Sequence, residues 1–300
     1  MFFKTSANGV IDVTGRNSKD VHLSSWVYSL LRDPLSKSAL KIRETFLESD
    51  YGRRYPVVDG IYDLRLLTTR YGRATEDWGT AQDEYEKYSA RERSSKRSSE
   101  YQAEQRGVQE VYELMPVVGR CLDVGGGDGR LRAFLEPDQE YMAIDPFLAM
   151  GSAKNRPREL KDVYPFIDEP FNFLCSLAEY LPLASESFNT VHMRSVLDHL
   201  SNTELAMREA HRVLRPGGRL IIGLYVKGGK SSTQKMDQRI KSVARGVLSA
   251  AGLTRYKDHH LWHPTYAELS DLIKACDFSI QLTHWQRSER DNVCYILATR

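Results

Sequence analysis

The chain has 300 residues and is 41% hydrophobic, which is enough to bury one large or two modest cores. Its 42 lysines and arginines nearly balance 40 aspartates and glutamates, and the net charge of +2 creates no overall field that would favour nucleic acid or an anionic membrane surface. No apolar run approaches the roughly eighteen residues of a membrane span and the first residues lack a signal-peptide core, so we expect a cytoplasmic protein without a membrane partner.

Residues 1–70 are predicted to form a separate small α+β domain. A helical apolar pattern starts at Trp26 and is stopped at Pro34. Short strand candidates follow at 41–47, 54–58 and 61–64, and Gly60 marks the turn between the last two.

Residues 71–106 are polar and charged, which is typical of a solvated helix or a linker. The alternative to a solvated segment is that the lysines and arginines in 71–106 contact a phosphate-bearing substrate. Three tyrosines in this stretch, Tyr85, Tyr88 and Tyr101, become, through the family resemblance given below, candidates for a lid that excludes water.

The segment from 107 onward begins with a helix whose apolar face includes Val111 and Met115. A strand at Cys121–Asp123 then runs into a turn with glycines at alternate positions, Gly125, Gly127 and Gly129. Glycine lets the backbone adopt positive φ and approach a ligand closely. A second strand ends in Asp145 about twenty residues later, where a nucleotide-binding α/β sheet places the carboxylate that holds ribose hydroxyls. The pattern predicts a β-α-β unit that binds a nucleoside, with a helix after the glycines.

Further strand and helix patterns continue to the end of the chain. Strands are predicted at 171–177 and 220–226. A helix and the turn Arg215-Pro-Gly-Gly218 precede the strand at 220–226. The final strands, 278–285 and 292–299, form an antiparallel hairpin. An insertion at 227–262, with a helical pattern that includes Ile240 and Val247, is predicted to cap the substrate side.

The four cysteines lie in predicted strands or at a helix end, and none forms a C-x-x-C pair. Cys121, Cys175, Cys276 and Cys294 are therefore expected to be reduced core thiols rather than members of a disulfide frame or a zinc site.

The run Asp123-x-Gly125-x-Gly127-x-Gly129 differs from the dinucleotide fingerprint and resembles the first motif of class I S-adenosylmethionine-dependent methyltransferases with a type 11-like core. The later segments 177–183, 187–192, 197–200 and 211–222 match that family in the right order. The resemblance implies an α/β, Rossmann-like, seven-stranded and mostly parallel sheet with helices on both faces, and S-adenosyl-L-methionine as cofactor.

The resemblance also implies the cofactor contacts. Gly125, Gly126 and Gly127 would approach the methionine part, and Asp123 would anchor its amino group directly or through water. Asp145 would bind the ribose, with Pro146 beside the cofactor. Many relatives have an acid after the third strand, but this chain has Ser176 and Leu177 there. The remaining predicted cofactor-binding residues are Leu177, Ala178, Glu179 and Arg194.

The N-terminal unit resembles a zinc-ribbon-derived domain that some methyltransferases carry, through the segments 33–40 and 55–64. Asp33 and Ser36 stand where metal-binding relatives have cysteines, so we expect no zinc in it. It would be held by apolar residues and by docking on its neighbour. Covering the substrate, mediating a homodimer and acting only as a stabilising appendage all remain open.

Three histidines are candidates for a base that removes a proton from the methyl acceptor, since the pKa of histidine lies near neutral. His199 is predicted at a strand end beside the reacting centre, where Asp198 could orient it. His260 and His263 lie in a cluster flanked by the aromatic residues Trp262 and Tyr266. The alternatives are a packing histidine for His199 and an exposed loop for the cluster. A metal site with Asp258 is conceivable by residue type, but consecutive histidines rarely face one ion, so none is expected.

The predicted function is O-methylation of a small molecule. An RNA or protein methyltransferase is one alternative, which would need a basic groove that the near-zero net charge does not favour. A non-catalytic protein that binds the cofactor or a partner is the other. A dispensable set of histidines would shift the acceptor atom from oxygen to nitrogen.

Overall fold

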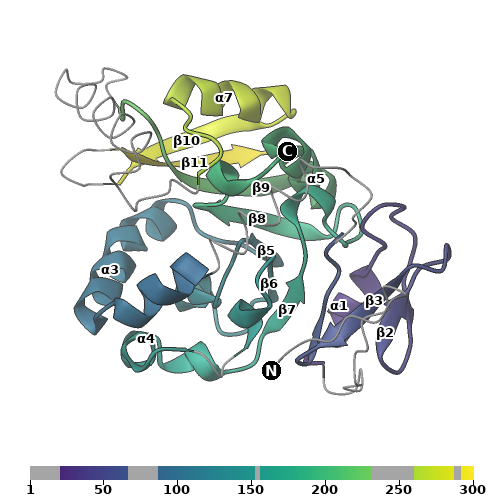
Figure 1. The fold of residues 1–300 in the computed structure, drawn as a ribbon. Helices are drawn as coiled ribbons and strands as arrows, with labels where there is room; N and C mark the ends of the chain where they lie inside the picture. Colours follow the sequence, from purple (N-terminus) through teal and green to yellow (C-terminus); the bar gives the residue numbers. More distant parts are fainter. Residues whose placement is uncertain (1–20, 67–86, 153–155, 231–259, 287–291) are drawn as a thin grey trace, which may run out of the picture.

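The structure is a computed structural model that describes residues 21–66, 87–152, 156–230, 260–286 and 292–300. Its main feature is a seven-stranded sheet in the order β10-β11-β9-β8-β5-β6-β7 (Figure 1). Strands β7, β6, β5, β8 and β9 are parallel to one another, whereas β11 is antiparallel to both β9 and β10. The strands are β5 (Cys121–Val124), β6 (Tyr141–Asp145), β7 (Asn172–Cys175), β8 (Phe188–Arg194), β9 (Leu214–Tyr225), β10 (Ser279–Trp285) and β11 (Val293–Thr299). The predicted fold class is confirmed.

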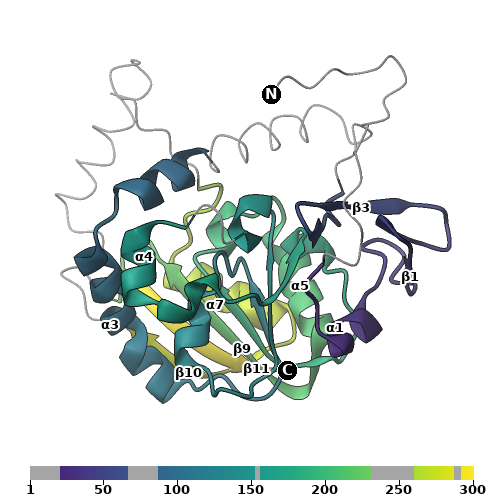
Figure 2. The ribbon, with the colours of Figure 1, turned by 90° about the horizontal axis from the view of Figure 1, so that it is seen from below.

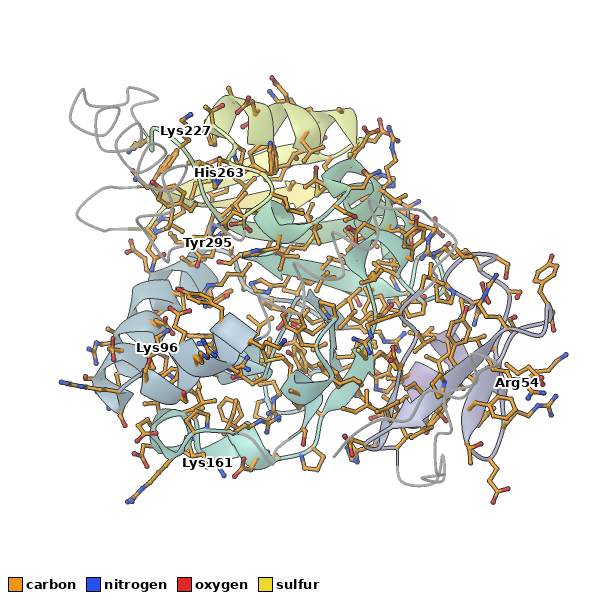
Figure 3. All side chains as sticks on the ribbon, viewed as in Figure 1. Arg54, Lys96, Lys161, Lys227, His263 and Tyr295 are labelled. Atoms are coloured by element: carbon orange, nitrogen blue, oxygen red, sulfur yellow. The ribbon has the colours of Figure 1, made fainter. Side chains whose placement is uncertain are left out.

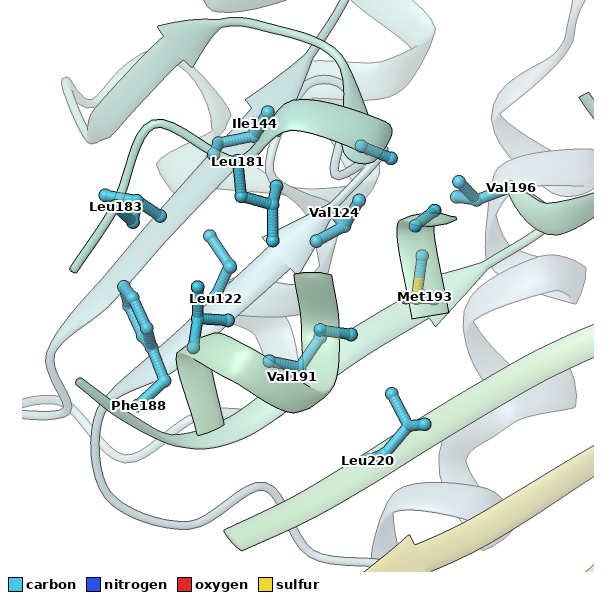
Figure 4. Packing of buried hydrophobic residues seen from close by; sticks show 14 of the residues in the cluster. Leu122, Val124, Ile144, Leu181, Leu183, Phe188, Val191, Met193, Val196 and Leu220 are labelled. Carbon is cyan, nitrogen blue, oxygen red and sulfur yellow. The ribbon is translucent and has the colours of Figure 1, made fainter. Parts of the chain in front are cut away.

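Helices cover both faces of this sheet because its strands alternate their apolar side chains between two cores. Along β6, Met142 and Ile144 face the core that contains α5 (Thr203–Val213) and α7 (Tyr266–Ala275). Ala143 faces the opposite core, which contains α3 (Ser98–Leu114). Figure 4 shows the first core around Leu122, Val191 and Leu220.

The N-terminal unit lies against the β7 edge of the sheet (Figures 1 and 2). The backbone N–H of Leu64 donates to the carbonyl of Cys175 over 2.8 Å, and Asp63 forms a parallel bridge to the same residue. Buried residues such as Val27 and Tyr62 belong to the same core cluster as the sheet. The unit therefore covers an otherwise open sheet edge. Its elements are α1 (Ser25–Leu30), β1 (Lys41–Ile42), β2 (Phe46–Glu48), β3 (Arg54–Val58) and β4 (Ile61–Tyr62).

A polar cluster fixes the loop around Asp33 in this unit. Asp33 is fully buried, and its carboxylate accepts hydrogen bonds from the backbone N–H groups of Leu35 (2.9 Å) and Ser36 (2.8 Å). It also accepts hydrogen bonds from the Tyr55 hydroxyl (2.9 Å) and from Arg53 (3.0 Å). These donors offset the cost of burying the carboxylate, so the loop is held by hydrogen bonds within the protein.

Two local predictions differ from the structure. The segment after the glycine turn is a 3-10 helix, η3 (Arg130–Phe134), rather than an α-helix. Strand β9 begins at Leu214 rather than at 220, because Leu214 already pairs with Phe188. The intervening turn, with Gly217 at φ 73°, then shifts the register before Thr190 pairs with Arg219.

The remaining expectations concern the cysteines, membrane spans and segments outside the described residues. All four cysteines are buried, and none of them forms a disulfide. Among the described residues, no helix has the length and apolar character needed to cross a membrane. The predictions for Tyr85, Asp258 and the helical pattern with Ile240 and Val247 lie outside the described residues.

Candidate active site

A cavity of about 280 Å³ lies at the carboxyl ends of four neighbouring strands. Gly125 follows β5, Asp145 ends β6, Ser176 follows β7 and Arg194 ends β8, and all four line it. This edge is where open α/β sheets bind ligands, because the loops diverge there.

The glycine loop forms the floor of this cavity with its backbone. Gly125 has φ 67°, and a Cβ atom at this position would lie 2.3 Å from a methyl group of Val196. Gly127 has φ 54°, and its N–H donates to Asp145 Oδ2 over 3.2 Å. Gly126 rests on Asp123, whose Cγ would lie 2.7 Å from an added Cβ. Any larger side chain at Gly125 or Gly126 would push the loop away from the strands beneath it.

Asp145 presents a buried carboxylate to the cavity beside Pro146, which also lines it. Burial raises the pKa of Asp145 to about 7, although the N–H groups of Phe147 and Gly127 counteract this by donating to its two oxygens. Further donors from a ligand would favour the ionised form. This carboxylate is therefore suited to a pair of ligand hydroxyls.

The segment after β7 forms the wall next to Asp145. Leu177 and Ala178 line the cavity, and the buried hydroxyl of Ser176 has no hydrogen-bond partner among the described residues. Glu179 also lines it, but its Oε1 accepts hydrogen bonds from the backbone N–H of Ser201 over 3.0 Å and from the Ser201 hydroxyl over 2.9 Å. Glu179 thus holds the loop that follows His199.

Asp123 lies on a second cavity of about 220 Å³, behind the glycine loop. Its Oδ1 is 2.7 Å from His192 Nδ1, and its Oδ2 accepts a hydrogen bond from the Tyr141 hydroxyl over 2.8 Å. Both oxygens are thus engaged within the protein. The predicted contact between Asp123 and a cofactor amino group stays a prediction.

Arg194 lines both cavities from the end of β8. No carboxylate in the described part of the chain lies within ion-pair distance of its guanidinium, whereas the nearby Arg130 is paired with both Asp128 and Glu104 at 3.0 Å. A largely buried cation without an acidic partner favours binding of an anionic group.

The segment before α3 contributes charged rather than aromatic side chains to the cavity. Residues 87–95 are helical, and Glu92 and Arg93 line the cavity together with Lys96, which follows them. Tyr88 is exposed and Tyr101 is buried in a separate cluster. The sequence identified this stretch by its charge but did not show which of its residues face a ligand.

The structure brings two of the three candidate histidines together. The rings of His199 and His260 lie 4.6 Å apart at 30°, while His263 is one ring further away, at 5.8 Å from His260. Of the three, His199 lines the cavity. It lies in the 3-10 helix η8 (Leu197–His199) rather than at a strand end, because Ser195 has φ 52° and turns the chain out of β8. Figure 3 shows His263 on the loop before α7.

The sequence around this cavity is similar to that of a known protein family. Residues 122–222 match the family model described as a methyltransferase domain. This segment, which is less than half of the chain, is similar to methyltransferase domains. It contains the glycine loop, Asp145, Arg194 and His199, and the cofactor of such domains is S-adenosyl-L-methionine.

Relatives of the methyltransferase domain include the 27-O-demethylrifamycin SV methyltransferase of Amycolatopsis mediterranei, which is 30% identical over 47% of this chain and 51% of its own length. The malonyl-[acyl-carrier protein] O-methyltransferase of Alcanivorax borkumensis is 31% identical over 56% of this chain and 58% of its own length. The chain thus spans only slightly more than half of these relatives. A solved structure of the Burkholderia thailandensis 1,6-didemethyltoxoflavin-N1-methyltransferase aligns over 85% of this chain and 99% of its own, with 16% identity and a TM-score of 0.48.

Proposed function

We propose that the protein transfers the methyl group of S-adenosyl-L-methionine to an oxygen of a small-molecule acceptor, with His199 as the base. The observation that carries this proposal is that His199 lines the same cavity as Asp145 and the glycine loop. The methyl donor and the base would therefore face one enclosed space.

The order of the strands supports one orientation of the cofactor. The sheet places β7, β6, β5 and β8 side by side in that order. Adenine would lie at Leu177 and Ala178 after β7, and the ribose would bind Asp145 at the end of β6. The methionine part would then reach Gly125 and Arg194, whose guanidinium suits its carboxylate. In this orientation the sulfonium lies near the segment after β8 that carries His199.

The proposed reaction is an in-line displacement. The acceptor oxygen would attack the methyl carbon as the carbon–sulfur bond breaks. The electron pair of the broken bond would return to sulfur and give neutral S-adenosylhomocysteine. His199 takes the hydroxyl proton as the oxygen–carbon bond forms. The cavity contributes by holding both reactants at attack distance, which is the main contribution available to such a reaction.

Small-molecule O-methylation fits the composition and the names of two relatives. The net charge of +2 gives no field for nucleic acid. One relative is named as an O-methyltransferase and another as a demethylrifamycin methyltransferase. The four buried cysteines form no disulfide, which fits a reducing compartment, so we place the reaction in the cytoplasm.

The test combines cofactor binding with product formation. Tag-free protein freed of carried-over ligand is titrated with S-adenosylhomocysteine, and methyl-labelled S-adenosyl-L-methionine is incubated with a panel of phenols, alcohols and carboxylic acids. His199→Asn should keep the affinity for S-adenosylhomocysteine within about twofold but slow oxygen methylation by a factor of about 100 or more.

His284→Asn, on β10, is the matched control and should keep the wild-type rate. A wild-type protein that does not bind S-adenosylhomocysteine would overturn the assignment in favour of a non-catalytic protein. Full activity of His199→Asn, or methylation of nitrogen or carbon acceptors alone, would refute the histidine base and the oxygen acceptor.

A further inference from the structure

We propose that Asp198, His199 and His260 form a binding site for one divalent transition-metal ion of the zinc type at the wall of the cavity. These residues come from two segments far apart in the sequence, the 3-10 helix η8 and the chain before α7. Two imidazoles and one carboxylate are a ligand set that zinc commonly takes in proteins.

The geometry of the three side chains fits a single ion. His199 Nε2 lies 3.9 Å from Asp198 Oδ1, and His260 Nε2 lies 3.6 Å from Asp198 Oδ2. One ligand atom from each of the three residues lies within 4.8 Å of the other two. With zinc–ligand bonds of about 2.0–2.1 Å, the ligand atoms of a tetrahedral site lie about 3.3 Å apart. Small side-chain rotations would close the site.

The state of the Asp198 carboxylate is a second, independent observation. Asp198 is 6% exposed, and its buried Oδ1 has no hydrogen-bond partner among the described residues. A buried carboxylate oxygen without a donor costs free energy, since it has left water and gained no donor in return. A cation bound between Asp198 and the histidines would supply that missing interaction.

The backbone holds the two segments in place without the ion. The carbonyl oxygen of Asp198 accepts hydrogen bonds from the N–H groups of Leu261 over 2.7 Å and of Trp262 over 3.2 Å. On the other side, Glu179 Oε1 accepts the N–H of Ser201. The ligands are thus presented by tethered segments, which lowers the entropic cost of forming the site.

Among the described residues, three protein ligands converge, and His199 faces the cavity. A tetrahedral ion would therefore keep its fourth position for water or for an oxygen of a bound molecule. The consequence for activity rests on the proposed function. A coordinated Nε2 has no lone pair left to accept a proton, so a bound ion and base action by His199 exclude each other. Zinc-type ions would then inhibit methyl transfer.

The experiment measures ion binding without cofactor or acceptor, so its failure is distinct from failure of the proposed methyl transfer. Tag-free protein is stripped with a chelator and titrated with Zn²⁺ against a chromogenic chelator, and Co²⁺ binding is followed by visible absorption. One ion per chain is expected. Asp198→Asn and His260→Ala should each weaken binding by about tenfold or more.

His263→Ala removes a neighbouring histidine outside the proposed ligand set and should leave the affinity within about twofold. An unchanged midpoint of thermal unfolding in the absence of the ion would show that the variants are folded. The proposal is overturned if the wild type binds no ion, if Asp198→Asn and His260→Ala bind as tightly as the wild type, or if His263→Ala loses as much affinity as His260→Ala.

Discussion

His192 Nδ1 lies 2.7 Å from Asp123 Oδ1, and the two residues are direct neighbours in the pairing of β8 with β5. The hydroxyl of Tyr112, on α3, lies 3.0 Å from His192 Nε2. Burial raises the pKa of Tyr112 well above its usual value, so this hydroxyl stays protonated. A buried polar chain therefore joins α3 to the strand that carries the glycine loop.

Removing the tyrosine hydroxyl that donates to Asp123 should destabilise the protein. Tyr141→Phe leaves Asp123 Oδ2 without its 2.8 Å hydrogen bond in a buried position. We expect the free energy of unfolding to fall by about 1–3 kcal/mol in urea titrations. Tyr51→Phe, at a tyrosine that is 78% exposed, is the control and should change the stability by less than about 0.5 kcal/mol. Equal stability of both variants would contradict a structural role for this chain.

Cofactor affinity should depend on pH through Asp145. Its pKa is raised to about 7 by burial, and ribose hydroxyls would donate to its ionised form. The affinity for S-adenosylhomocysteine should therefore fall as pH drops below about 7, by up to about tenfold per pH unit. Calorimetric titrations between pH 5.5 and 8.5 measure this. Asp145→Asn should bind more weakly and without this dependence, and a flat profile for the wild type would refute the role of Asp145.

The raised pKa of Asp145 also affects the stability of the ligand-free protein. A carboxyl whose pKa is raised in the folded state contributes stability that is complete below its unfolded value of about 3.9 and is lost as pH rises through about 7. We expect Asp145→Asn to be more stable than the wild type at pH 8 and to lose this advantage by pH 4. Thermal unfolding without ligand at both pH values tests the sign.

Arg194 should contribute to cofactor binding through the carboxylate of the methionine part. Loss of a charge-assisted hydrogen bond of about 1.5–3 kcal/mol corresponds to a loss of affinity of about 10- to 150-fold for Arg194→Met. 5′-Methylthioadenosine lacks the amino-acid part, so the same substitution should leave its affinity nearly unchanged. Arg215→Met, at an exposed arginine in the turn of β9, is the control for both ligands. An equal loss for both ligands would indicate a general structural effect instead.

The N-terminal unit should depend on the buried carboxylate of Asp33. Asp33→Asn removes the ion pair with Arg53 and weakens the hydrogen bonds from Ser36 and Tyr55, so we expect a loss of about 2–4 kcal/mol in the free energy of unfolding. Asp50→Asn, which alters only an exposed ion pair with Lys41, should cost less than about 1 kcal/mol.

The pH dependence provides a second measure of Asp33. Burial by itself would raise the pKa of Asp33, but hydrogen bonds from Ser36, Tyr55 and Leu35 and the charge of Arg53 outweigh it and lower the pKa overall. This contribution is present above the unfolded pKa of about 3.9 and is lost as pH falls through the folded value. The stability difference between wild type and Asp33→Asn should therefore shrink as the protein is acidified below about pH 4.

The sequence by itself determined the succession of strands and helices along the chain, the glycine loop and the position of Asp145 at the end of a strand. Each of these depends on residues within about twenty positions of one another, so period, glycine spacing and strand ends are sufficient to predict them. The 3-10 helix after the loop and the early start of β9 were mispredicted, since both depend on how the chain meets its neighbours in the sheet.

The tertiary structure alone decided which distant side chains meet. Asp123 contacts His192 because β5 and β8 are neighbours in register, and His260 reaches Asp198 because backbone hydrogen bonds join two remote segments. The lack of an acidic partner for Arg194 among the described residues likewise depends on every element packed around it. A linear sequence does not encode these proximities directly, because they depend on strand order and register in the folded sheet.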